Sequence, residues 1–169
     1  SSMVHDLDPA AAPAHTHAER CRALVAAART ATLSTLAREP EGFPFGSLVT
    51  VAFDAAGRPL LLLSELAEHT QNLLACSSAS LLVVAPGAEG ADLSVERLTL
   101  VGVCERLSGA AAEAASGIFL AAHPAAAAYV AFKDFAFYGL RPVGLRYVGG
   151  FGRMSWVDLT EYERAGLGG

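Results

Sequence analysis

Four consecutive leucines, Leu60 to Leu63, are followed directly by Ser64, and no other segment constrains the fold of this chain so strongly. An uninterrupted apolar run of this length is typical of a short strand that is buried on both faces. After Ser64, a favoured N-cap residue, leucine and threonine recur at the three- and four-residue spacing of an amphipathic helix. The segment predicts a buried strand at 60–63 that leads, through Ser64, into a helix at 65–75.

The predicted start of this helix is a candidate anion site. Free backbone N–H groups and the positive end of the helix dipole are available there to a phosphate. Ser64 and Thr70 would add hydroxyls, and His69 would add a cation. A capped helix after a strand is also a common structural arrangement, so this motif alone leaves both interpretations open.

Similar patterns predict the other elements. Apolar and β-branched runs indicate strands at 30–36, 47–53, 80–84, 98–107, 140–148 and 151–157. Helices are expected at 18–28 and, on both sides of Pro124, within 110–128. Gly102 inside the longest strand indicates a bulge, and Gly149-Gly150 indicates a tight turn. Several links of hairpin length favour a mostly antiparallel barrel over a doubly wound sheet.

Three motifs carry a family resemblance. They are Gly42–Asp54 (GFPFGSLVTVAFD), residues 60–73 (LLLLSELAEHTQNL) and Val148–Trp156 (VGGFGRMSW). Their order resembles the FMN-binding split-barrel superfamily, whose best-known member is pyridoxamine 5'-phosphate oxidase. It is most similar to the branch that also holds the haem-degrading split-barrel proteins.

The resemblance implies a fold, a cofactor and an assembly. The fold would be mainly β with helices (α+β), a six-stranded, Greek-key-like FMN-binding split barrel. FMN would be bound without a covalent bond at a homodimer interface, in a flavin-dependent oxidoreductase of unknown substrate. No residue stands out as a catalytic acid or base, so the catalytic residues are not predicted.

The same resemblance implies the cofactor-binding residues. Ser47, Leu48, Val49 and Thr50 match the strand that lines the flavin, and Ser64, His69 and Thr70 match the residues that hold its phosphate. At the C-terminal motif Arg153 and Trp156 are further candidate contacts.

The oxidase carries an arginine and a lysine at two places where this chain has Ser47 and Ala52. Neutral hydrogen bonds are weaker than charge-assisted ones, so a phosphate would be held less tightly here. Arg97 could supply the missing cation, or it could instead form an ion pair with Glu96 or Asp92.

Two other functions remain open on the same barrel, namely a haem-binding or haem-degrading protein and a cofactor-free interaction module. Haem needs an axial ligand such as histidine. Only His69 and His123 lie in the part of the sequence that is predicted to be ordered, so FMN is preferred to haem. No pair of histidines has the spacing of zinc ligands, and no metal site is predicted.

Charge and composition exclude several classes. The net charge of −5 and the single lysine argue against a nucleic-acid surface. No apolar run approaches the roughly 20 residues of a membrane helix, and no signal peptide precedes the first predicted helix. Three widely spaced cysteines are expected to be reduced thiols of a cytoplasmic protein. The alanine and arginine bias suggests a bacterial genome.

The chain is expected to form one domain, a split barrel at 18–158, between a disordered arm at 1–17 and a flexible tail at 159–169. Aromatic residues crowd into the segment from Tyr129 to Tyr138. Such a cluster is typical of a core or an interface, which agrees with the homodimer that the resemblance implies.

Overall fold

The computed structural model describes residues 15–87, 90–91 and 93–166, so most of the arm predicted at 1–17 lies outside the described residues. Eight antiparallel strands form one sheet. They are β1 (Thr30–Leu36), β2 (Pro44–Thr50), β3 (Ala52–Phe53), β4 (Pro59–Ser64), β5 (Ser78–Val84), β6 (Arg97–Arg106), β7 (Phe135–Val148) and β8 (Met154–Trp156). None of the described helices is long and apolar enough to cross a membrane.

The sheet curls because its two ends are consecutive in the chain. Its strand order is β2-β1-β5-β6-β7-β4-β3, with β8 paired to β7. Only Val51 separates β2 from β3, and this fully buried residue leaves the ladder, its N–H donating to the Arg29 carbonyl over 3.0 Å. The mostly antiparallel sheet is confirmed and curls into a half barrel, but it has eight strands and not the predicted six. The single strand predicted at 47–53 breaks at Val51, and the short β8 completes a hairpin.

The predicted bulge in the long strand is confirmed. The register between β6 and β7 shifts at Val101/Gly102. A Cβ on Gly102 would lie 2.2 Å from the Arg141 carbonyl oxygen, so only glycine allows the two strands to approach this closely. β7 begins five residues before the predicted start at Leu140, because the aromatic segment around Phe137 pairs with β4.

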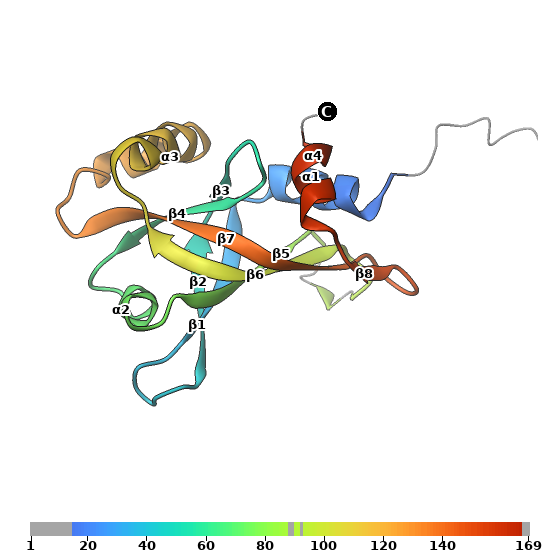
Figure 1. Cartoon of the computed structure of the whole chain (residues 1–169), viewed down its shortest axis with the longest axis horizontal. Helices are drawn as coiled ribbons and strands as arrows, with labels where there is room; N and C mark the ends of the chain where they lie inside the picture. The colour runs from blue at the N-terminus through green and yellow to red at the C-terminus, as the bar shows by residue number, and fades with distance from the viewer. Residues whose placement is uncertain (1–14, 88–89, 92, 167–169) are drawn as a thin grey trace, which may run out of the picture.

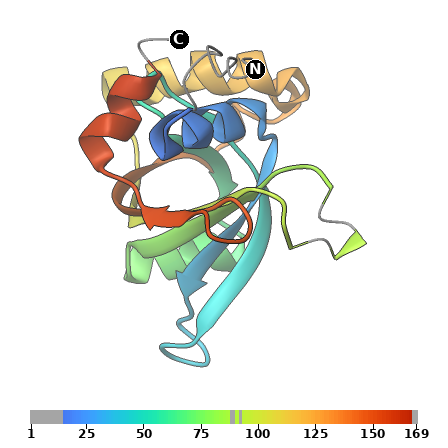
Figure 2. The same ribbon diagram turned by 90° about the vertical axis from the view of Figure 1, so that its right-hand side faces the viewer.

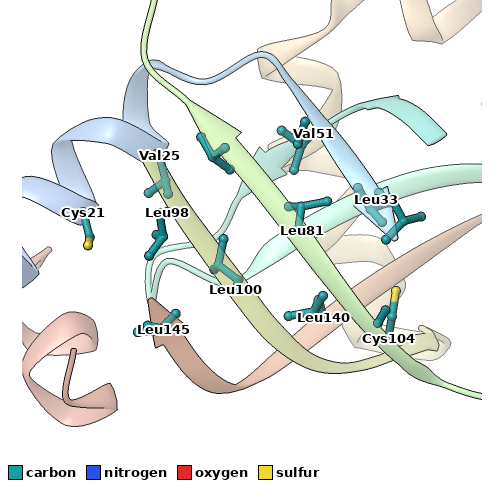
Figure 3. Close-up of a cluster of buried hydrophobic side chains, with 14 of the residues drawn as sticks. Cys21, Val25, Leu33, Val51, Leu81, Leu98, Leu100, Cys104, Leu140 and Leu145 are labelled. Atoms are coloured by element: carbon teal, nitrogen blue, oxygen red, sulfur yellow. The ribbon is translucent and has the colours of Figure 1, made fainter. Parts of the chain in front are cut away.

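Alternate residues of the strands fill the barrel. Leu33, Leu81, Leu98, Leu100 and Leu145 are fully buried together, and Figure 3 shows them converging from neighbouring strands. Burying each such side chain contributes about 1.5–3 kcal/mol. The period of two that places these residues inside therefore also places their neighbours on the opposite face of the sheet.

Helices cover two parts of the barrel (Figure 1). α1 (His17–Ala27) begins with a capping box between Thr16 and Glu19 and packs beside α4 (Leu159–Ala165). Arg22 joins them, since its guanidinium donates to the Tyr162 and Glu163 carbonyls over 2.9 and 3.0 Å. The tail predicted to be flexible therefore contains a docked helix.

The third helix, α3 (Gly109–Ala122), and the 3₁₀ helix η3 (Pro124–Ala128) cover a second apolar cluster around Phe119, Leu62 and Phe137. The break between them falls at Pro124, as predicted. In Figure 2 this pair runs along the side of the barrel opposite the hairpin of β1 and β2.

Candidate functional site

The junction between β4 and α2 (Glu68–Ala75) differs from the predicted phosphate site. Ser64 is not the N-cap, because a turn at residues 65–67 intervenes and Ala67 caps the helix without a side-chain hydrogen bond. Instead Ser64 Oγ accepts from the Leu66 N–H over 3.1 Å and donates to Asp134 Oδ2 over 3.0 Å. The hydroxyl is thus already engaged, next to a carboxylate.

The other two predicted phosphate ligands differ in accessibility. Thr70 is fully buried, and its hydroxyl is unpaired, the single such case among the buried side-chain polar atoms of the described residues. His69 is half-buried, and this burial lowers its pKa, which favours the neutral imidazole over the predicted cation. The nearby carboxylates of Glu68 and Glu65 contact Arg38 at 3.5 Å and Arg106 at 3.7 Å, respectively.

The four predicted residues of β2 alternate between two sides of the sheet. Leu48 is 77% exposed and Thr50 is also exposed, whereas Val49 belongs to the core and Ser47 is half-buried. A strand cannot present consecutive side chains to one ligand surface, so only Leu48 and Thr50 can contribute side chains outside the barrel.

A row of side chains crosses the sheet on its exposed side. The strand registers connect Leu48, Thr32, Leu82, Thr99, Arg146 and Trp156, in this order, over β2, β1, β5, β6, β7 and β8. Beside it runs a row of small or short side chains, namely Gly46, Ser34, Ser80, Val101 and Gly144. On the other side, Val84, Arg97, Val148 and Met154 are paired. We call these three rows the outer face.

Two arginines and a tryptophan mark one end of the outer face. The Arg146 guanidinium lies 5.6 Å from the centre of the Trp156 ring, a distance typical of a cation–π contact. A Cβ on Gly144 would lie 3.2 Å from the Trp156 ring, so this indole, 65% exposed, extends over the row of small residues. The outer face therefore combines an apolar surface, hydroxyls and positive charge.

Arg97 adopts neither of its predicted roles fully. Its guanidinium donates to the backbone carbonyls of Leu93 and, over 3.2 Å, Val95. Glu96 instead forms an ion pair with Arg20 at 3.1 Å, and Asp92 lies outside the described residues. Among the described residues no carboxylate forms an ion pair with Arg97, whose guanidinium is held by these carbonyls at the edge of the outer face.

The predicted turn at Gly149-Gly150 is confirmed as the β7–β8 hairpin, with φ of 110° at Gly150 and 73° at Gly152. Arg153 braces this turn by donating to the Gly149 carbonyl over 2.8 Å. Phe151 projects fully into solvent at its tip.

Three of the described histidines have different surroundings. His123 Nε2 is 2.8 Å from the Val51 carbonyl oxygen, and His17 Nδ1 is 2.6 Å from Ser155 Oγ. His69 has no hydrogen bond to a described residue. Within the described ranges, no cluster of His, Cys, Asp and Glu could hold a metal ion.

Some residues of the outer face were predicted from the sequence, and others were not. The structure brings Leu48, Thr50, Arg97 and Trp156 to the exposed side of the sheet, whereas Ser64, His69 and Thr70 lie at the β4–α2 junction. Arg146, Leu82 and Thr32 were missed, although the alternation of their strands could have indicated them. Whether the predicted residues bind a cofactor stays a prediction.

Comparison with known proteins relates this architecture to haem proteins. The model of the CREG β-barrel family matches residues 12–164. A curated Arabidopsis thaliana protein, the chloroplastic non-canonical haem oxygenase HOZ, is 41% identical over 118 residues, which cover 70% of this chain and 36% of that protein. A solved haem-binding protein from Mycobacterium smegmatis is 38% identical, with a TM-score of 0.83, over 90% of this chain and 62% of that one.

More distant structures share the fold. A Clostridium acetobutylicum protein of the pyridoxinephosphate oxidase family is 16% identical, with a TM-score of 0.63, over 86% of this chain and 96% of that chain. This likeness confirms the predicted split-barrel fold. The chain spans about a third of the length of the Arabidopsis protein and under two thirds of the mycobacterial one.

Proposed function

Since the chain belongs to the CREG β-barrel family, we propose that it is a haem-binding protein that holds the tetrapyrrole on the outer face of a homodimer. Similarity to two haem-related proteins at 41% and 38% identity supports this choice of ligand. The observation that carries it is the outer face itself, a broad apolar surface that ends in two arginines. Haem thus replaces FMN as the first candidate.

A flat apolar macrocycle fits the shape of this surface. Ser34 and Ser80 of the second row leave room above the sheet between Leu48, which stands higher on β2, and the Trp156 ring, which covers Gly144. Apolar area removed from water stabilises a complex by roughly 25 cal/mol per Å². Bound haem would supply the iron chemistry, while these side chains would orient the ring and exclude water.

The charge of the surface fits the acidic groups of haem. Arg97 and Arg146 lie at the β6–β8 end of the outer face, and guanidinium groups form charge-assisted hydrogen bonds with carboxylates. We assign them to the haem propionates.

An axial ligand must come from the flank of this surface, because none of the described outer-face residues is a histidine. His69 is the best candidate among the described histidines. Its burial favours the neutral imidazole, which is the form that ligates iron. The ring would approach haem from the same chain or across the dimer interface.

A second copy of the chain would cover what the monomer leaves exposed. Leu82, Val101 and Met154 remain exposed on the outer face beside Leu48 and Trp156, and contiguous apolar patches mark interaction sites. Sedimentation at micromolar concentration should show a dimer for the natural protein and a monomer for Leu48→Glu.

FMN remains the second candidate for one reason. The unpaired Thr70 hydroxyl in the first turn of α2 is a donor that a nearby phosphate could use. Against it stands the Ser64 hydrogen bond to Asp134, which places a negative charge at the expected phosphate position.

Titration with haemin, followed through the Soret band, tests the proposal. We expect one haem per chain, a weakened complex for Arg146→Gln, and a shifted Soret band for His69→Ala. His123→Ala is the matched control, because the Val51 carbonyl already engages its Nε2. One-to-one binding of FMN together with haem uptake that does not saturate would overturn the proposal.

A further inference from the structure

A cavity of about 420 Å³ opens between α3 and strands β4, β6 and β7. Its volume lies within the roughly 300–1,000 Å³ of small-molecule sites. We propose that this cavity binds a small apolar carboxylate, such as a medium-chain fatty acid, and that Arg141 receives the carboxylate. The proposal does not depend on haem binding.

The walls of the cavity are apolar because α3 presents alanines to it. Ala111, Ala115 and Ile118 share one face of the helix at four- and three-residue spacing, and Ala114 lies at the margin. Leu60 and Val103 lie on the opposite, sheet side. Short alanine side chains hold the helix near the sheet without filling the space between them, so an alkyl chain can occupy it.

The charged rim has a positive excess. Three arginines, Arg58, Arg106 and Arg141, face two carboxylates, Asp54 and Glu105. Asp54 Oδ1 is satisfied by two backbone N–H groups, those of Ala56 and Arg58, each over 2.9 Å.

The arginines differ in their partners. Arg58 pairs with Glu163 at 3.1 Å, and Arg106 pairs with Glu65 at 3.7 Å. Arg141 is exposed and forms no hydrogen bond or ion pair through its side chain within the described part of the chain. A guanidinium presents parallel N–H donors that match a carboxylate, so Arg141 is the available anchor.

Glu105 sets the orientation of the ligand. It pairs with Gly139 in the β6–β7 ladder, while Arg141 pairs with Val103, so both charged side chains lie on the cavity side of the sheet. An anionic head group would avoid Glu105 and contact Arg141. A zwitterion or a cation would instead need the Glu105 carboxylate, which makes this residue diagnostic.

Isothermal titration of the full chain with sodium decanoate, below its micellar concentration, tests the proposal. We expect saturable one-to-one binding, and much weaker binding of 1-decanol, which has the same chain length without the charge. Arg141→Gln should weaken decanoate at least tenfold, which corresponds to about 1.4 kcal/mol. Arg164→Gln is the matched control, because it removes the same charge from an exposed position on α4.

Two more variants separate the alternatives. Ala114→Phe fills the margin of the cavity without disturbing a buried position and should abolish binding, while its melting temperature confirms folding. Glu105→Gln should preserve or strengthen binding. Two results would overturn the proposal directly, namely weaker binding of decanoate to Glu105→Gln and equal binding of decanol and decanoate. A third would be a change of sedimentation in Ala114→Phe without loss of decanoate binding, since the cavity would then be a subunit contact.

Discussion

The Ser64 hydroxyl donates a hydrogen bond to Asp134 Oδ2 over 3.0 Å, which ties the end of β4 to the segment before β7. The backbone repeats this link, because the Glu65 N–H donates to the Asp134 carbonyl over 2.6 Å. Ser64 thus stabilises the split-barrel junction through a carboxylate, and this arrangement opposes an anionic ligand at the same place.

Replacing Asp134 by Asn should raise the affinity for FMN relative to riboflavin by about fivefold, since two unit charges near 4 Å interact by about 1 kcal/mol in water. Fluorescence titration of both flavins measures this ratio. Glu113→Gln, with the same change of charge on the exposed part of α3, is the control. An unchanged ratio would mean that no phosphate binds at the β4–α2 junction.

Alkaline pH should destabilise the protein through its buried thiols. Burial raises the pKa of Cys104 from 9.0 to about 12, and that of Cys21 also to about 12. The pKa of each thiol is higher in the folded than in the unfolded state. The free energy of unfolding therefore keeps its full value below pH 9 and falls as the pH rises toward 12. Each thiol can contribute a slope of up to about 1.4 kcal/mol per pH unit.

Urea denaturation at several pH values between 8 and 11 would measure this slope, and Cys104→Ala should reduce it. Cys76→Ala should leave it unchanged, because Cys76 is only half-buried. A slope that is the same in Cys104→Ala and in the natural protein would contradict the assignment.

Tyr162 should be a strong contributor to stability. Its hydroxyl donates to the Gly57 carbonyl over 2.6 Å, and the residue is fully buried. Tyr162→Phe should cost about 1–3 kcal/mol of unfolding free energy, because the buried carbonyl loses its donor. The matched control is Tyr129→Phe, since that half-buried hydroxyl makes no hydrogen bond to a described residue. Equal losses in both variants would rule out the hydrogen bond as the cause.

Two glycine-to-alanine substitutions should have opposite effects. Gly102→Ala places a methyl group against the Arg141 carbonyl and should cost more than about 2 kcal/mol through overpacking. Gly117→Ala, in the middle of α3, meets no atom within 4 Å and should stabilise by about 0.5–1 kcal/mol. Thermal melts of the two variants provide the comparison, and a stable Gly102→Ala would show that the bulge can move.

Much of the fold could be predicted because local patterns and tertiary structure agree. Residues 30–36 form the expected strand, and the Gly102 bulge and the Gly149-Gly150 turn occur where glycine indicated them. The break at Val51 could not be predicted, since a buried valine suits a continuous strand and only barrel closure removes it from the ladder. Helix α4 was missed because Tyr162 becomes buried only through contact with distant residues.

The site was harder to predict than the fold. Spacing in one strand indicates which residues share a face, but only the registers of six strands join Leu48 to Trp156 in one row. Arg146 carries no motif of its own and acquires its position through pairing with Thr99 and Trp156. Ser64 looked like a cap because Asp134, its actual partner, is 70 residues away.

The contact between α1 and α4 has a consequence for synthesis on the ribosome. The helix that covers residues near 20 is made about 140 residues after them, as the Arg22–Tyr162 hydrogen bond shows. Until α4 is made, the apolar side of α1, with Leu24 and Val25, lacks part of the surface that it packs against. A nascent chain of this protein should therefore be a substrate for chaperones until α4 has been made, and should acquire protease resistance only then.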